Sequence, residues 1–131
     1  MPAILFVCIG NACRSQIAEA YLCSLAKEQN RHDIQVFSAG SSPLGYIPQE
    51  TITVMAEVGI DLSQHSSKGI SAVSQQEFNY VVSLCGDYCP YVPAEQHISW
   101  NIPDPFGGDW NTFRNVREEI KQRVMDLLKE I

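Results

Sequence analysis

Two kinds of segment are missing from this sequence of 131 residues: a long apolar run, and a basic leader followed by an apolar stretch. A transmembrane helix needs roughly 20 consecutive apolar residues, and a secretory signal begins with basic residues ahead of its apolar part. We therefore expect a cytoplasmic protein without a membrane partner, whose cysteines stay mostly reduced. Repeats and low-complexity tracts are also absent, so the length predicts one domain over residues 1–131.

Basic residues are scarce. The chain has nine Lys and Arg against fifteen Asp and Glu, and its formal net charge is -6. Because the basic residues are scattered and form no stripe, a nucleic-acid partner is not expected. A site for a phosphate-like group in such a chain is expected to bind a small anion or a phosphorylated side chain.

Apolar patterns with strand and helix periods alternate along the chain. Strands are predicted over residues 3–7, 33–38 and 80–84, with a weaker one around Ile98 and Trp100. Helices are predicted over residues 15–28, from Pro48 up to Gly59, and over residues 109–129. This order predicts an α/β fold with a four-stranded parallel sheet and helices on both faces. The last helix carries one apolar stripe, made of Phe113, Val116, Ile120, Val124, Leu127 and Leu128.

A thiol stands at the end of the first predicted strand. Cys8 is followed by Gly10 and Asn11, which tolerate left-handed backbone angles, and then by Arg14 and Ser15 at the start of a helix. Unpaired amides and the helix dipole favour an oxyanion and a thiolate there, and the Arg14 guanidinium can hold two oxygens. The predicted oxyanion-binding residues are Ile9, Gly10, Asn11, Ala12, Cys13, Arg14 and Ser15. The Cys13 side chain has no separate partner and is expected to be a buried apolar residue.

Two further groups follow later strands and are expected at the same edge of the sheet, beyond the carboxyl ends of the strands. Asp104 lies between two prolines, which restrict its backbone, so its carboxyl group is a candidate general acid, with an ordinary turn aspartate as the alternative. Cys85 and Cys89 are spaced by one helical turn and suit thiol–disulfide exchange.

The thiols allow two other interpretations. Cys85 and Cys89 could be structural, or they could join Cys8 and Cys13 in a zinc site. Zinc is disfavoured because neither pair has the two-residue spacing of structural zinc motifs. The three histidines, His32, His65 and His97, do not cluster in the sequence and are expected at the surface or in hydrogen bonds.

These motifs together resemble a known family. Residues 8–15, 16–19, 38–40, 59–63 and 104–105 resemble the low-molecular-weight protein tyrosine phosphatase superfamily along nearly the whole chain. Within it, the chain is most similar to the thiol-dependent arsenate reductases. Three features favour that branch: Gln16 where phosphatases usually have proline, the strand leading to Cys85, and Phe106-Gly107 where phosphatases often carry tyrosines.

The resemblance implies the fold of that superfamily and a reaction sequence. Cys8 would attack arsenate held by the loop and Arg14, while Asp104 protonates a departing oxygen. Cys85 would then attack Cys8 and release arsenite, and Cys89 would open the resulting disulfide to give a Cys85–Cys89 disulfide.

The resemblance also bears on cofactors and partners. It implies no tightly bound cofactor and an external reductant, either thioredoxin or glutathione with glutaredoxin. The three-residue spacing between Cys85 and Cys89 is shorter than in thioredoxin-coupled relatives, so the reductant stays open. Some reductases hold potassium behind the loop, and the matching positions are Asn11, Glu19, Ser38 and Asp61.

Two other functions remain open at the level of the sequence. A phosphatase acting on phosphotyrosine or small phosphoesters would need only Cys8, Arg14 and Asp104. A non-enzymatic anion-binding or redox-sensing module would use Cys8 and Cys85 as a regulatory disulfide. A high rate of hydrolysis of a small phosphoester without added thiol would favour the phosphatase. Absence of both arsenate reduction and phosphoester hydrolysis in fresh, reduced protein would favour the non-enzymatic module.

Overall fold

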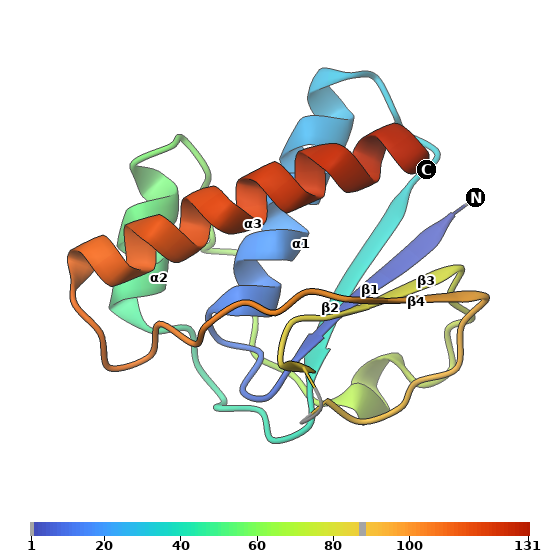
Figure 1. Ribbon diagram of the computed structural model, residues 1–131, viewed down its shortest axis with the longest axis horizontal. Helices are drawn as coiled ribbons and strands as arrows, with labels where there is room; N and C mark the ends of the chain where they lie inside the picture. The colour runs from blue at the N-terminus through green and yellow to red at the C-terminus, as the bar shows by residue number, and fades with distance from the viewer. Residues whose placement is uncertain (1, 87–88) are drawn as a thin grey trace.

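The computed structural model describes residues 2–86 and 89–131, and its sheet follows the predicted order of elements (Figure 1). The four strands are all parallel and lie in the order β2-β1-β3-β4. Their bounds are β1 Ala3–Cys8, β2 Gln35–Gly40, β3 Tyr80–Ser83 and β4 Gln96–Ser99. The helices are α1 Arg14–Glu28, α2 Gln49–Ala56, α3 Trp110–Glu130 and the 3-10 helix η1 Ile70–Val73.

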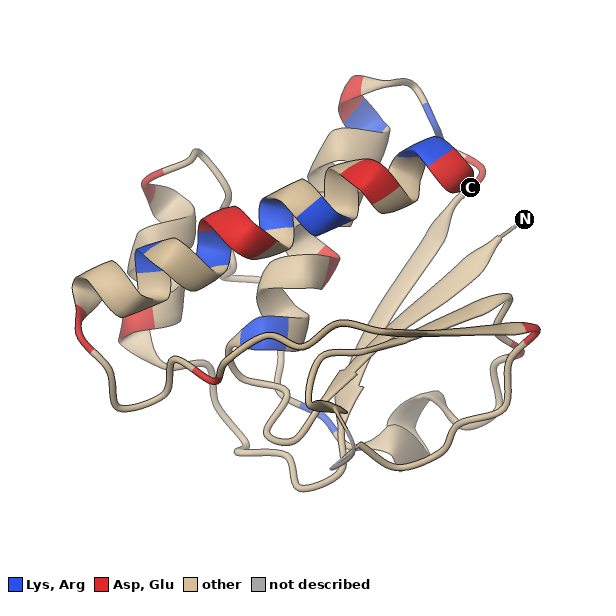
Figure 2. Ribbon diagram, in the orientation of Figure 1, with Lys and Arg blue, Asp and Glu red and all other residues tan. Residues whose placement is uncertain are grey.

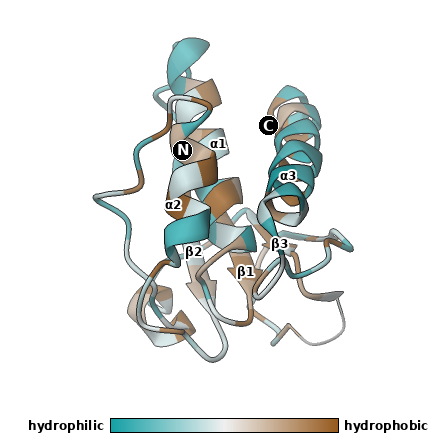
Figure 3. Cartoon of the chain, turned by 90° about the vertical axis from the view of Figure 1, so that its left-hand side faces the viewer, coloured by the Kyte–Doolittle hydropathy of each residue, from teal (hydrophilic) through white to brown (hydrophobic). Residues whose placement is uncertain are grey.

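Strand β1 lies inside the sheet and divides the core into two layers. Its six residues are all buried, as expected for a parallel strand covered on both faces. Alternate side chains, including Phe6 and Cys8, pack in the same cluster as residues of α1 and α3, whereas Leu5 and Val7 pack on the opposite face with Val73 of η1. Figure 3 shows the three α-helices together on one side of the strands. The predicted four-stranded parallel sheet of an α/β fold is confirmed, but the second face is covered by the 3-10 helix η1 and the adjoining loops rather than by an α-helix.

The helix α3 closes the outer layer. Its predicted apolar stripe is buried in full, from Phe113 to Leu128, and packs against α1 and α2. The predicted first residue, Asp109, is the N-cap, and its carboxylate accepts the Thr112 backbone N–H at 2.8 Å. Acidic and basic residues are interspersed along the helix in Figure 2. Within the described residues, no helix is both long and apolar enough to cross a membrane.

The strand boundaries differ from the prediction by one residue at β1 and β3 and by more at β2 and β4. Strand β2 begins at Gln35 rather than at Asp33, because its pairing with β1 starts at Ala3; the Asp33 carboxylate lies outside the sheet, 3.0 Å from the Arg31 guanidinium. Strand β2 then continues to Gly40, which pairs with Cys8. The strand expected around Ile98 is β4, and Trp100 still donates its backbone N–H to the Ser83 carbonyl.

The register of the sheet brings three chain segments to one edge. Strand β1 ends at Cys8, β3 leads through Leu84 into Cys85, and β4 leads into the segment that carries Asp104. Because the strands are parallel, all three segments emerge at the carboxyl edge, as predicted. This edge is where the candidate site forms.

Candidate active site

The segment between Cys8 and Arg14 is fixed from outside by a second loop. The carbonyl oxygens of Cys8, Ile9 and Gly10 accept the backbone N–H groups of Ser41, Ser42 and Leu44, at 3.3, 2.9 and 2.8 Å. In a trans peptide the carbonyl and the following N–H point in opposite directions, so the amides of the loop turn inward. Asn11 adds a left-handed residue with φ 47°, which helps successive amides converge on one anion.

Gly40, the last residue of β2, lies directly behind this loop. A methyl group added at Gly40 would meet the Ile9 carbonyl oxygen and would lie 2.8 Å from the Asn11 backbone nitrogen. Both atoms belong to backbone that is already fixed by hydrogen bonds. Glycine is therefore required here by close approach of two chain segments rather than by a positive φ.

We predict that Gly40→Ala weakens phosphate binding and destabilises the protein. The added methyl group would displace the loop, and overpacking of this kind costs about 1–3 kcal/mol. Chemical denaturation and calorimetric titration with phosphate would measure the two effects. Gly69→Ala is the matched control, since Gly69 pairs with Gly40 but its added methyl group would meet its nearest neighbour at 3.5 Å. Equal behaviour of the two variants would contradict the prediction.

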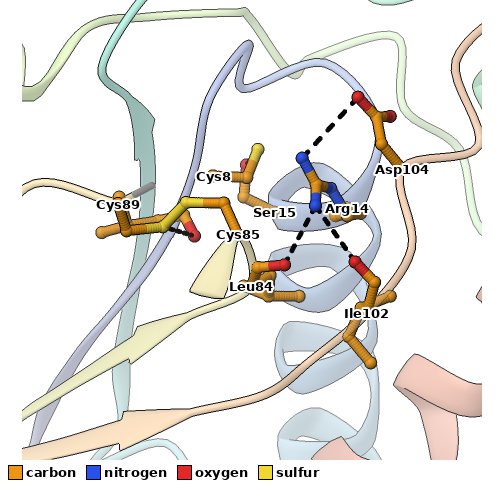
Figure 4. Close-up of a disulfide and its surroundings, with 9 residues drawn as sticks. Cys8, Arg14, Ser15, Leu84, Cys85, Cys89, Ile102 and Asp104 are labelled. Atoms are coloured by element: carbon orange, nitrogen blue, oxygen red, sulfur yellow. Dashed lines mark hydrogen bonds and ion pairs between the residues drawn. A yellow bond between two sulfur atoms is a disulfide. The ribbon is translucent and has the colours of Figure 1, made fainter. Parts of the chain in front are cut away.

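Arg14 opens α1 and is almost fully buried, with 6% of its surface exposed. Its Nη1 donates to the carbonyl oxygens of Leu84 and Ile102, both at 3.0 Å, as Figure 4 shows. These two carbonyls belong to the segments that follow β3 and β4. The guanidinium is thus held in one orientation at the floor of the site, and it links the loop to the residue that precedes Cys85.

A cavity of about 200 Å³ opens above the loop and contains most of the predicted catalytic groups. Cys8, Arg14 and Asp104 all line it. Asp104 is 51% exposed, and its Oδ2 lies 3.7 Å from Arg14 Nη2, while its Oδ1 accepts the Phe106 backbone N–H at 3.0 Å. The remaining lining is largely apolar and consists of Ile9, Gly10, Ala12, Cys13, Ser42, Leu44 and Phe106.

A larger hollow of about 800 Å³ lies on the opposite face of the sheet, beside η1 and the segment 91–95. Its charged groups are Glu77 and Glu95, and the described residues that line it include no cysteine, histidine or basic residue. The predicted nucleophile and most of the predicted anion ligands therefore line the smaller cavity.

Asn11 and Ser15 do not line the cavity but are fully buried behind it. Ser15 Oγ lies 2.8 Å from Cys8 Sγ, so the hydroxyl can donate a hydrogen bond to a thiolate. Asn11 Nδ2 donates to Ser15 Oγ at 2.8 Å and to Ser38 Oγ at 3.0 Å. The Cys8 thiol, the predicted nucleophile, is thus oriented by a chain of hydrogen bonds that begins inside the protein.

The predicted thiol pair is joined as a disulfide beside the loop. Cys85 and Cys89 are bonded to each other, with Cα atoms 5.4 Å apart. Cys89 Sγ also contacts the Val7 carbonyl oxygen at 3.5 Å, one residue before Cys8 (Figure 4). Cys85 is 7% exposed. Asp87 and Tyr88, between the two cysteines, lie outside the described residues.

The other cysteines and the histidines have structural surroundings. Burial raises the pKa of the Cys13 thiol to about 11, in agreement with the expected apolar role, whereas Cys23 is an exposed free thiol on α1. His32 is exposed, while His97 Nε2 is 2.7 Å from the Val92 carbonyl oxygen. Within the part of the chain that is described, no three His, Cys, Asp or Glu side chains gather as a metal site.

Sequence reasoning missed a polar network behind the loop that includes His65 and Lys68. Gln16 Nε2 donates to Asn11 Oδ1 at 2.9 Å, and Gln16 Oε1 lies 3.1 Å from His65 Nδ1. Glu19 and Ser38, two of the expected potassium ligands, belong to the same network, with Ser38 Oγ donating to Glu19 Oε1 at 2.6 Å. Only one indication of this network was present in the sequence, which was Gln16 at a position where phosphatases usually have proline.

Comparisons with known proteins agree with this geometry. Residues 3–131 match the family model of low molecular weight phosphotyrosine protein phosphatase. The arsenate reductase of Staphylococcus aureus (strain Newman) is 42% identical over 122 residues, which cover 90% of this chain and 89% of that protein. A solved arsenate reductase in the phosphate binding state has a TM-score of 0.88 at 34% identity, covering 100% of this chain and 99% of the other.

This chain is also similar to part of a longer solved chain. That longer chain is a thioredoxin-dependent arsenate reductase of Corynebacterium glutamicum, with a TM-score of 0.80 and 32% identity. The similarity covers 99% of this chain and 61% of that chain.

Proposed function

The chain belongs to the low molecular weight phosphotyrosine protein phosphatase family, and from this membership we propose that it is an arsenate reductase that uses Cys8, Cys85 and Cys89 in sequence. The observation that carries this proposal is the disulfide between Cys85 and Cys89 at the edge of the anion loop. Phosphoester hydrolysis has no use for such a pair, whereas reduction of As(V) to As(III) requires two electrons, the number that two thiols give up when they form a disulfide.

The first step is binding and attack. Arsenate occupies the cavity, where the loop amides and Arg14 bind its oxygens. The Cys8 thiolate, supported by the Ser15 hydroxyl, attacks the arsenic atom and forms a sulfur–arsenic bond. Asp104 lines the same cavity and protonates the departing oxygen, which leaves as water.

The second step is reduction. Cys85 attacks the sulfur atom of Cys8 and forms a Cys8–Cys85 disulfide. The electron pair of the sulfur–arsenic bond moves to arsenic, which leaves as arsenite. The link between Arg14 and the Leu84 carbonyl supports this step, because it ties the residue before Cys85 to the floor of the anion site.

The third step returns Cys8 to its thiol form. Cys89 attacks Cys85, the Cys85–Cys89 disulfide forms, and Cys8 leaves as thiolate. An external thiol reductant then reduces that disulfide, which suits a reducing compartment such as the cytoplasm. Thioredoxin is our first candidate, because a similar reductase is named thioredoxin-dependent, and glutaredoxin with glutathione is the second.

Mass spectrometry of the reduced protein after addition of one equivalent of arsenate tests the proposal. We expect a loss of two hydrogens and, after proteolysis without reductant, a peptide pair linked through Cys85 and Cys89. In Cys89→Ser protein we expect the link between Cys8 and Cys85 instead, because the exchange step cannot occur. If Cys8, Cys85 and Cys89 all remain free thiols and arsenate is not consumed, the proposed sequence of steps is refuted.

Phosphatase activity is the second candidate. Cys8, Arg14 and Asp104 line one cavity, and its mouth includes the exposed apolar side chains of Ile9 and Phe106, which suit an aryl group. Hydrolysis through a Cys8 phosphoenzyme would need no further thiol. A rate of phosphotyrosine hydrolysis above the rate of arsenate reduction would favour this candidate.

A further inference from the structure

The polar network behind the anion loop contains a lysine from a distant segment. Lys68 Nζ lies 3.5 Å from Ser38 Oγ and 3.2 Å from the Ser66 carbonyl oxygen. The backbone N–H of Lys68 donates to Asn11 Oδ1 at 2.8 Å, which holds this segment against the loop. An ammonium group is therefore built into the region where the family resemblance led us to expect potassium.

The oxygens expected to bind potassium are engaged by groups of the protein. Asn11 Oδ1 accepts hydrogen bonds from Gln16 Nε2 and from the Lys68 backbone, which fills both of its acceptor positions. Ser38 Oγ accepts from Asn11 Nδ2, is approached by Lys68 Nζ, and donates to Glu19. The set as found does not fit a potassium ion.

Asp61, the fourth expected ligand, is occupied elsewhere. It is exposed, its Oδ1 accepts the Ser63 backbone N–H at 2.9 Å, and its Oδ2 accepts the Ser63 hydroxyl at 2.9 Å. These hydrogen bonds close a local turn rather than joining Asn11, Glu19 and Ser38. The carboxylate that would add charge to a potassium site is thus committed to its own loop.

The network nevertheless needs a positive charge, because it contains the largely buried carboxylate of Glu19. Burial by itself raises the pKa of Glu19, but hydrogen bonds from His65 and Ser38 and the charge of Lys68 outweigh burial and lower it. His65 Nδ1 lies 3.6 Å from Glu19 Oε1. A cation inside the network offsets the free-energy cost of burying the ionised Glu19 carboxylate.

We propose that the Lys68 ammonium is the fixed cation of this network and that oxyanion binding by this protein is therefore independent of potassium. Lys68 acts as a positioning residue: its charge supports Glu19 and Ser38, which hold Asn11, and Asn11 holds the loop and Ser15. The inference concerns the same loop as the proposed function, but its readouts are phosphate binding and thermal stability, which need no arsenate turnover.

The first test replaces the salt cation in solutions of the unmodified protein. Phosphate affinity and Tm are measured in potassium chloride and in tetramethylammonium chloride at equal ionic strength. We expect the dissociation constant for phosphate to change less than about twofold, since a charge fixed by the chain needs no ion from solution. A clear gain in phosphate affinity and Tm in potassium would overturn the proposal.

The second test removes the charge and then restores it. We expect Lys68→Gln to bind phosphate about tenfold more weakly, the size of effect typical of losing one charge-assisted hydrogen bond, and Lys68→Arg to stay near wild type. Lys27→Gln, an exposed site on α1, controls for loss of one positive charge. If Lys68→Gln binds phosphate as tightly as Lys68→Arg does, the proposal is overturned. If Lys68→Gln does not fold, the comparison of the two salts still tests the proposal.

These outcomes are distinct from failure of the proposed function. A protein that binds phosphate independently of potassium but forms no disulfide with arsenate would keep the inference and lose the reductase. A protein that reduces arsenate but binds oxyanions only in potassium would do the reverse.

Discussion

Cys85→Ser is expected to abolish repeated reduction of arsenate while leaving hydrolysis of a small aryl phosphate within about threefold of wild type. The thiol at this position makes the bond that lets arsenite leave, and a serine hydroxyl cannot form the disulfide that supplies the two electrons. We expect a loss of roughly 10³-fold or more, as for other groups that form a covalent bond during turnover. Arsenite formation with an excess of external dithiol and hydrolysis of p-nitrophenyl phosphate would measure the two activities in the same preparation.

The controls for this variant lie in the same chain. Cys23→Ser removes an exposed free thiol on α1 and is expected to leave both activities unchanged. Cys89→Ser is expected to complete one turnover and then stop with Cys8 linked to Cys85. Steady arsenate reduction by Cys85→Ser would mean that an external thiol attacks the Cys8 adduct directly, and the internal pair would then have no catalytic role.

The retained phosphatase activity separates chemistry from structure. Cys85 is buried, so the variant needs a readout of damage to the adjoining loop. Serine is nearly the same size as cysteine, and Arg14 keeps the Leu84 carbonyl as its partner in the variant. If the hydrolysis rate fell together with arsenate reduction, the loss would reflect damage to the anion site instead of loss of the electron donor.

The fold and the anion loop could be predicted because their signals are local. The apolar run of β1, the residues from Cys8 to Ser15 and the stripe on α3 each lie within about 20 residues of chain, and α/β alternation then determines which ends share an edge. Asp104 and Cys85 could be placed at the same edge of the sheet because each follows a strand. No contact between distant segments had to be known.

The support of the loop could not be predicted in the same way. Lys68 and Ser67 lie 57 residues from the loop positions Asn11 and Gly10 to which they bond, and they belong to a segment without a periodic pattern. His65 looked like an ordinary surface or hydrogen-bonded histidine in the sequence. Only the packing of this segment against Gln16 and Glu19 reveals a network. Residues that hold a site from behind are therefore the part that sequence patterns describe least.

Arg14→Lys is expected to lower kcat/KM for arsenate by about 10²–10³, which corresponds to roughly 2.7–4 kcal/mol of lost transition-state stabilisation. Lysine keeps the charge but has one nitrogen, whereas the guanidinium serves two carbonyls through Nη1 and still presents Nη2 toward Asp104 and the cavity. One ammonium cannot hold the Leu84 and Ile102 carbonyls and two oxygens of the anion together.

Because Arg14 is proposed to bind the anion and contacts the segment before Cys85, its loss should slow adduct formation and the later attack by Cys85. Quenched-flow mass spectrometry would follow the Cys8 adduct and the disulfide separately, and Arg114→Lys in the exposed pair with Glu57 is the matched control. A variant slowed only in adduct formation would show that Arg14 acts on the anion alone. A variant within tenfold of wild type in both steps would contradict the assignment of Arg14, since a buried guanidinium with two backbone acceptors would then be a structural residue.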